Sequence, residues 1–130
     1  MMNKRKSIPK KIRLLVYEKC NHRCGYCGCE IEYKDMQVDH VIPLNGWSKQ
    51  GTDTFDNMLP ACRSCNHYKS RSTLDGFRKM VEAMPDVLMR DNNTYKNAVR
   101  FGLVIPNKKS VVFYFETIGK KGSEEGEYDK

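Results

Sequence analysis

Apolar residues near the start of the chain recur at helical spacing. Ile12, Leu15 and Val16 follow an i, i+3, i+4 pattern, which places them on one face of a helix over residues 9–18. The segment 14–17 taken alone also fits a strand. We therefore expect a short helix here, with a strand as the alternative.

Two short apolar segments further along predict a pair of strands. Residues 36–42, MQVDHVI, alternate in part and are rich in β-branched side chains, and Pro43 ends the run. Residues 57–61, NMLPA, form the second segment. The stretch between them, 44–56, is rich in Gly, Ser, Thr and Asp and predicts a long loop, of a length that is usually functional or mobile in compact domains.

The C-terminal half predicts helices followed by one strand. A helix should begin directly after the second strand, and a second helix carries an apolar stripe from 74 to 84 that we assign to core packing. A weaker helical pattern spans 93–100. Residues 110–117, SVVFYFET, alternate with a period of two and predict a strand. From 119 onward Gly, Lys and Glu dominate, which predicts a disordered tail.

Length and composition favour a single α+β domain. The chain has 130 residues, of which 39% are hydrophobic and 30% charged, as in globular proteins. We expect a flexible basic arm at 1–8, a central domain at 9–85, a helix and strand at 86–118 packed on that same domain, and a disordered tail at 119–130.

The charge is positive and asymmetric. The net charge is +7, and six Lys and Arg residues fall in the first thirteen positions with no acid among them. This pattern favours a polyanionic partner, although a solvated tail would show the same charge. No run approaches the roughly 18 apolar residues of a membrane span, and the N-terminus lacks the apolar core of a secretion signal. We expect an intracellular, cytoplasmic protein without a membrane partner.

The cysteines are arranged as metal ligands rather than as disulfide partners. A reducing compartment disfavours disulfides, and four of the six cysteines form two Cys-x-x-Cys pairs. Two such pairs can close a tetrahedral structural zinc site. The predicted Zn²⁺ ligands are Cys24, Cys27, Cys62 and Cys65.

Other residues near the first pair compete for places at this zinc. Cys20 or Cys29 could replace one member of the first pair, and His22 could also act as a ligand. Only Cys24 and Cys27 share the x-x spacing of the downstream pair. A second kind of site is indicated by Asp39, His40 and Asn66, which suit an oxygen-liking cation beside a general base.

Taken together, these motifs resemble the HNH endonuclease family. The resemblance covers about residues 12–75 and follows the order of motifs in the family. It rests on Asp39 with His40, Asn57, the run Cys62-x-x-Cys65-Asn66, and Lys69. The resemblance implies a ββα-metal (His-Me finger) fold, in which a two-stranded hairpin and one helix surround a single catalytic divalent cation.

The resemblance also implies roles for individual residues. His40 matches the general base, Asp39 and Asn66 match the ligands of a catalytic Mg²⁺ or Mn²⁺, and Asn57 matches the residue that steadies the hairpin and the base. Asn66 stands where many members have His, and this variant resembles active members. Lys69 could hold a phosphate or lie solvated on a basic helix.

The implied activity is metal-dependent hydrolysis of DNA phosphodiester bonds. The expected substrate is double-stranded DNA, and the protein could act as a monomer or a homodimer. Two alternative functions would also account for the charge and the cysteines. One is a non-catalytic zinc-stabilised nucleic-acid-binding module, and the other is a basic domain with a structural metal and a protein partner. Both leave the spacing of Asp39, His40, Asn57 and Asn66 unexplained.

Overall fold

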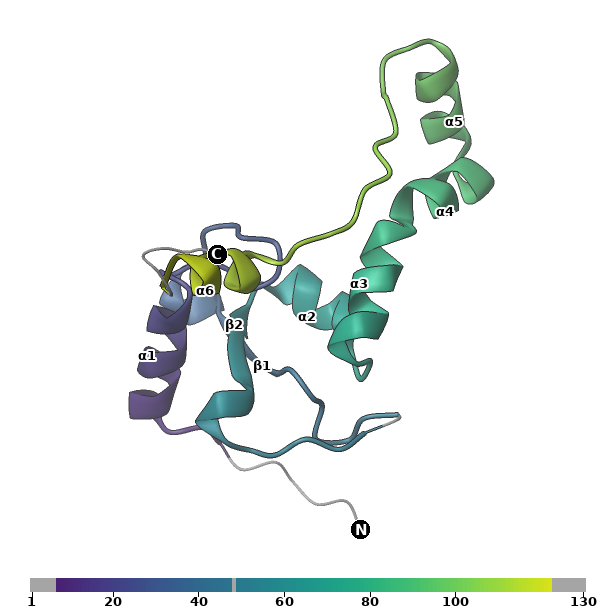
Figure 1. Ribbon diagram of the computed structural model, residues 1–130. Coiled ribbons are helices and arrows are strands. Elements are labelled where there is room, and N and C mark those ends of the chain that lie inside the picture. The colour runs from purple at the N-terminus through teal and green to yellow at the C-terminus, as the bar shows by residue number, and fades with distance from the viewer. Residues whose placement is uncertain (1–6, 48, 123–130) are drawn as a thin grey trace.

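In the computed structural model, residues 7–47 and 49–122 are described, and they form a mixed α+β fold (Figure 1). The predicted α+β class is therefore confirmed. In chain order the elements are α1 (Lys10–Lys19), η1 (Tyr33–Asp35), β1 (Gln37–His40), η2 (Phe55–Asn57), β2 (Met58–Ala61), α2 (Arg63–Lys69), α3 (Leu74–Glu82), α4 (Met84–Asp91), α5 (Asn93–Arg100) and α6 (Tyr114–Gly122).

The centre of the fold is an antiparallel hairpin. β1 pairs with β2 in a register that sets Gln37 opposite Ala61 and His40 opposite Met58. Every residue of β2 is buried, because α1 packs against this strand and an aromatic cluster covers it elsewhere. The two predicted strands are confirmed, and the alternative of a strand at 14–17 is wrong because those residues lie in α1.

An aromatic cluster joins parts of the chain that are distant in sequence. The ring of Tyr26 meets Phe77 of α3 and Phe113 edge-on, at centroid distances of 5.3 and 5.2 Å. Phe77 and Phe113 stack at 5.4 Å. Such ring pairs contribute packing energy beyond the area they bury. The cluster therefore holds together α3, the residue before α6, and the first cysteine loop, which is the turn from Cys24 to Cys27.

The predicted strand over 110–117 is wrong, because α6 begins at Tyr114. The backbone N–H groups of Tyr114 and Phe115 donate to the carbonyls of Tyr26 and Gly25, at 3.1 and 2.8 Å. The Phe113 N–H donates to the carboxylate of Glu116 at 2.8 Å, as at a helix N-terminus. Alternation alone could not reveal that these donors bond to a loop rather than to a neighbouring strand.

The predicted ends of the chain lie largely outside the described residues. Residues 123–130 of the predicted tail are not described, and α6 is assigned up to Gly122, so that prediction stays untested. The predicted basic arm at 1–8 also falls mostly outside the described part, since 1–6 are not described. Among the described residues, every helix is too short or too polar to cross a lipid bilayer.

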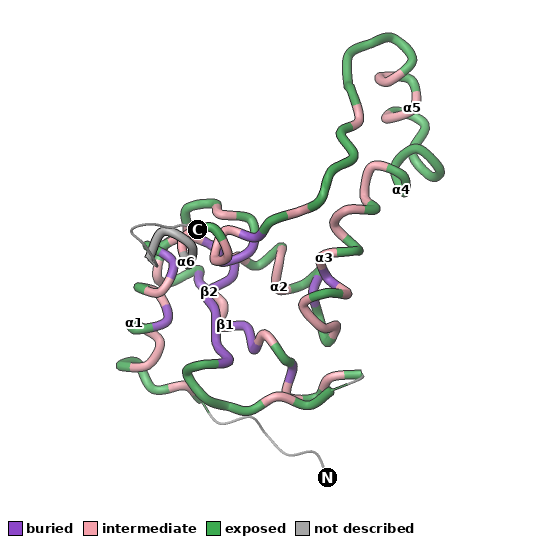
Figure 2. The backbone as a smooth tube through the Cα atoms, in the orientation of Figure 1, coloured by how far each residue is buried: buried purple, intermediate pink, exposed green. Residues whose placement is uncertain are grey.

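Helices α4 and α5 project away from the hairpin (Figure 1). The predicted stripe ending at Met84 is split, since α3 ends at Glu82 and α4 starts with Pro85 in its first turn, where proline fits a helix. Residues 83–112 contain no buried residue, whereas the hairpin and the first cysteine loop hold much of the core (Figure 2). The predicted site residues therefore lie in the body formed by the hairpin, α1, α2 and α3.

Candidate active site and zinc centre

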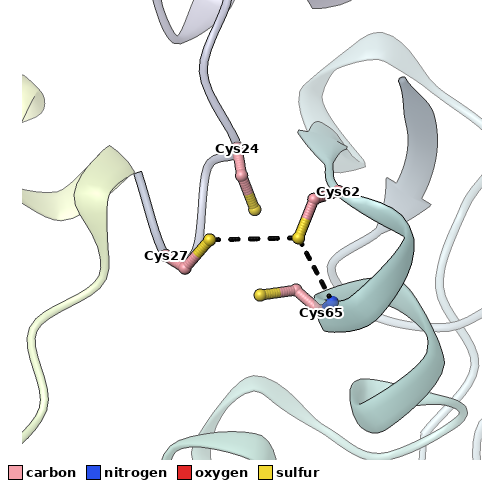
Figure 3. Close-up of side chains that lie close together, drawn as sticks. All are labelled: Cys24, Cys27, Cys62 and Cys65. Carbon is pink, nitrogen blue, oxygen red and sulfur yellow. Dashed lines mark hydrogen bonds between the residues drawn. The ribbon is translucent and has the colours of Figure 1, made fainter. Parts of the chain in front are cut away.

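The four predicted thiols converge on one point (Figure 3). Their sulfur atoms all lie within 4.8 Å of one another, and the Sγ atoms of Cys27 and Cys62 are 3.9 Å apart. A tetrahedral zinc with Zn–S bonds of about 2.3 Å places its sulfurs about 3.8 Å apart. The cluster therefore fits a zinc ion held by Cys24, Cys27, Cys62 and Cys65.

Local backbone contacts bring the two pairs together. The N–H of Gly25 donates to the carbonyl of Pro60 at 2.8 Å, which docks the first pair on β2 just before the second pair begins. A Cβ at position 25 would lie 3.2 Å from that carbonyl oxygen, so glycine permits the close approach. The Sγ of Cys62, the residue before α2, accepts from the N–H of Cys65 at 3.4 Å.

The electrostatics of the cluster favour an anionic sulfur. The pKa of Cys24 is lowered to about 4, chiefly because the thiol of Cys65 hydrogen-bonds to its sulfur. Backbone groups at Cys62, Cys27 and Tyr26 act in the same direction. The pKa of Cys65 is raised in turn, chiefly by that same hydrogen bond, and burial raises the pKa of Cys27. Thiolates are the form that binds zinc, so a cation at this point would offset the charge of the remaining sulfurs.

The competing ligands are arranged differently. Cys20 is 1% exposed and lies outside the group of four, and burial raises its pKa to about 11. Cys29 is exposed and is likewise not in that group. His22 pairs with Glu18 at 2.8 Å and stacks on Tyr17. The geometry therefore selects the two Cys-x-x-Cys pairs.

A second site lies in a cleft of about 850 Å³ beside β1. Asp39 and His40 from β1 and Asn66 from α2 all line it. Three basic residues line the same cleft: Arg13, Lys34 and Arg71. The structure thus brings a carboxylate, an imidazole and an amide to one basic cleft, a set that can hold an oxygen-liking cation beside a base.

The carboxylate of Asp39 is buried and held from two sides. It is 6% exposed, and its Oδ2 accepts from the hydroxyl of Tyr26 at 2.5 Å and lies 3.1 Å from Nζ of Lys69. Burial raises the pKa of Asp39, against the opposing effects of Lys69 and Tyr26. The contacts from Tyr26 and Lys69 are both made to Oδ2 of Asp39 rather than to its Oδ1. Since Tyr26 lies between Cys24 and Cys27, the loop that carries the first cysteine pair directly supports Asp39.

The imidazole of His40 contacts a residue that the motifs did not indicate. Its Nε2 lies 2.8 Å from Oδ1 of Asp53, which belongs to the loop between the strands. The side chain of His40 is 3% exposed and that of Asp53 is 43% exposed. The sequence signal for Asp53 was only its place in a long loop between two motif elements.

Asn57 closes that loop onto the hairpin. Its Oδ1 accepts from the N–H of Ile42 at 2.9 Å, and its Nδ2 donates to the carbonyls of Ile42 and Thr52, both at 2.8 Å. Asn57 is 9% exposed, so these bonds are made largely out of water. The side chain therefore fixes both ends of the loop to each other.

Comparison with known proteins assigns this region to a family. The HNH endonuclease family matches residues 24–72. These residues form an HNH endonuclease domain. The HNH domain contains both cysteine pairs, β1, β2 and α2, while α1 and α3 to α6 lie outside the match.

Relatives of the HNH domain include two kinds of protein. The chain is 33% identical over 52 residues to the CRISPR-associated endonuclease Cas9 of Corynebacterium diphtheriae, covering 40% of the chain and 5% of the relative. It is 35% identical over 60 residues to the Septu protein PtuB of Bacillus thuringiensis, covering 45% of the chain and 23% of the relative. The chain thus spans less than a quarter of either relative. The family match and these relatives together indicate a nuclease-type function for the HNH domain.

A solved structure is also similar. The Type II-C Cas9 enzyme from Actinomyces naeslundii matches with a TM-score of 0.48 and 27% sequence identity, over 54% of this chain and 8% of that one.

Lys69 of the HNH domain lies away from solvent, contrary to its predicted role. Lys69 is 0% exposed, and its Nζ donates to the carbonyl of His40 at 3.1 Å besides pairing with Asp39. A buried ammonium with these partners does not face a phosphate, so the predicted substrate contact is wrong. Lys69 instead ties α2 to β1, because the last turn of α2 packs against that strand.

Proposed function

We propose that this chain is a metal-dependent endonuclease that hydrolyses DNA phosphodiester bonds in the cleft beside β1. The observation that carries the proposal is the meeting of Asp39, His40 and Asn66 in one cleft with basic residues along it. The HNH endonuclease match over residues 24–72 supports the same reaction class.

His40 is the proposed general base. Hydrolysis requires a water molecule to lose a proton as it attacks phosphorus, and a neutral imidazole accepts a proton near pH 7. His40 lines the cleft at the end of β1, and the attacking water is proposed to bind there. Its backbone carbonyl is fixed by Lys69, which limits movement of the residue.

Asp39 and Asn66 are the proposed ligands of the catalytic cation. Both offer oxygen atoms, and a single carboxylate with an amide suits Mg²⁺ or Mn²⁺, which retain several waters. When bound, such a cation supplies charge neutralisation at the phosphate and at the leaving O3′. Tyr26 and Lys69 both contact Oδ2 of Asp39 and so orient its carboxylate.

Cations of the cleft are the proposed contacts to the DNA backbone. Arg71 lies over the ring of Trp47 at 5.3 Å, and Trp47 is an exposed residue. Arg13 donates to the carbonyl of Met36 at 3.1 Å, which fixes its guanidinium at the cleft. Phosphate contacts of this kind provide affinity without sequence specificity. Double-stranded DNA is the proposed substrate, bound by a monomer or homodimer.

The sulfur-bound zinc is proposed to be structural. A hairpin and one short helix bury little apolar area, and metal binding can stabilise so small a core. Four thiolates complete a tetrahedral shell, which leaves no position for substrate. The zinc therefore holds the loop that carries Tyr26 rather than taking part in hydrolysis.

Cleavage of supercoiled plasmid by zinc-loaded protein tests the proposal. We expect no strand breaks with zinc alone, and nicked or linear product once Mg²⁺ or Mn²⁺ is added. Because EDTA would also remove the zinc, dialysis into zinc-containing buffer is the better starting state. A protein that binds plasmid but cuts it with neither ion would instead be the non-catalytic binding module.

A further inference from the structure

We propose that Asp53 is a positioning residue for the reaction, one that fixes the tautomer and orientation of His40. This inference rests on the proposed nuclease function and assigns a role to a residue outside the family motifs. Its basis is the contact of 2.8 Å between Nε2 of His40 and Oδ1 of Asp53, at a histidine whose side chain is only 3% exposed.

The chemistry of the pair defines the tautomer. A carboxylate can only accept a hydrogen bond, so the Nε2 atom that faces Asp53 carries the hydrogen. In the neutral imidazole the lone pair then lies on Nδ1 of His40. Nδ1 is therefore the atom that takes the proton from water. In the opposite tautomer Nδ1 would carry the hydrogen and could not accept that proton.

The backbone on both sides of Asp53 is held by one residue. The carbonyl of Thr52 accepts from Nδ2 of Asn57 at 2.8 Å, and the carbonyl of Thr54 accepts from the backbone N–H of Asn57 at 2.9 Å. Asp53 lies between these two anchored carbonyls. Asn57 thus acts on His40 through the loop, by setting where the carboxylate of Asp53 lies.

Gly51 allows the loop between the two strands to pass close to the backbone of Ile42 and Pro43. The N–H of Gly51 donates to the carbonyl of Pro43 at 2.8 Å. A Cβ at position 51 would lie 1.9 Å from the carbonyl oxygen of Ile42 and 2.7 Å from Nδ2 of Asn57, so no side chain fits there. The segment leading to Asp53 is therefore packed directly against the residues that follow β1.

Replacement by an isosteric amide separates positioning from loop structure. Asp53→Asn keeps the size of the side chain but introduces an N–H₂ group that can donate to Nε2 and so stabilise the wrong tautomer. The same exchange at the carboxylate of the serine protease triad costs about ten-thousandfold in kcat. The matched control is Asp56→Asn, which removes the same charge from an exposed residue three positions away.

The experiment measures single-turnover cleavage, DNA affinity and thermal unfolding for the wild type and both variants. We expect Asp53→Asn to cleave at least roughly tenfold more slowly with unchanged DNA affinity and unfolding temperature, and Asp56→Asn to match the wild type. Equal cleavage rates for Asp53→Asn and wild type would overturn the inference. A slower rate that comes with an equally large loss of stability or DNA affinity would also overturn it.

Imidazole ¹⁵N NMR distinguishes failure of this inference from failure of the proposed function. Wild-type His40 should show hydrogen on Nε2, and Asp53→Asn should shift the population toward hydrogen on Nδ1. That result is independent of cleavage, so an inactive wild type with this signature would refute only the nuclease proposal. An unchanged His40 tautomer in Asp53→Asn, with an active wild type, would refute only the role of Asp53.

Discussion

Replacing Tyr26 with Phe isolates the link between the first cysteine loop and Asp39. The substitution keeps the ring, which is 3% exposed and packs edge-on against Phe77 and Phe113. It takes away the hydroxyl, and with it the hydrogen bond of 2.5 Å to Oδ2 of Asp39. That length is typical of a charge-assisted O–H···O⁻ bond.

The magnitude follows from the burial of both partners. A hydrogen bond to a charged group contributes about 1.5–3 kcal/mol, and a buried acceptor left without its partner costs about 1–3 kcal/mol. Lys69 still contacts Oδ2 after the substitution, which keeps Asp39 partly compensated. We therefore expect Tyr26→Phe to lower the free energy of unfolding by about 2 kcal/mol.

Urea unfolding of zinc-saturated protein measures this change. Tyr68→Phe is the matched control, because Tyr68 is 52% exposed and lies on the same domain. The control should change the free energy of unfolding by less than about 0.5 kcal/mol. If Tyr26→Phe were as stable as Tyr68→Phe, the claim that the first cysteine loop supports Asp39 through this hydroxyl would be refuted.

Three further substitutions test other parts of the HNH domain. Lys69→Met leaves Asp39 buried without its cation and should lower the free energy of unfolding by about 3–5 kcal/mol in urea titrations, a loss that a solvated phosphate-binding lysine would not show. Cys65→Ser should lose zinc and unfold at much lower urea; a variant that loses its zinc but keeps wild-type stability would rule out a stabilising zinc, and one that keeps both would rule out Cys65 as a ligand. Gly51→Ala places a Cβ 1.9 Å from the carbonyl oxygen of Ile42 and should slow single-turnover cleavage while zinc content is kept. Wild-type cleavage by Gly51→Ala would show that the loop position does not matter.

Local patterns were sufficient to predict the hairpin and most helices. The strand segments at 36–42 and 57–61 and the helix over 93–100 depend on short-range spacing, which the sequence displays directly. The cysteine cluster was also predictable, because two x-x spacings restrict which thiols can share an ion.

Properties set by distant contacts could not be predicted in this way. Alternation at 110–117 resembles a strand, but the donors of that segment bond to the first cysteine loop and a helix forms instead. Lys69 is an ordinary helical lysine in sequence, and only the packing of α2 on β1 buries it. Asp53 lies in a loop whose path depends on Asn57 and Gly51, so its contact with His40 has no local signature.

The central claim is that His40 is the base of a cation-dependent phosphodiester-cleaving centre. The most direct test is the single-turnover rate of His40→Ala, measured with zinc-loaded protein at a concentration that saturates the DNA, and with added Mg²⁺. We predict a loss of at least roughly a hundredfold in the cleavage rate, with zinc content and DNA affinity unchanged. Cleavage by His40→Ala at the wild-type rate would contradict the claim.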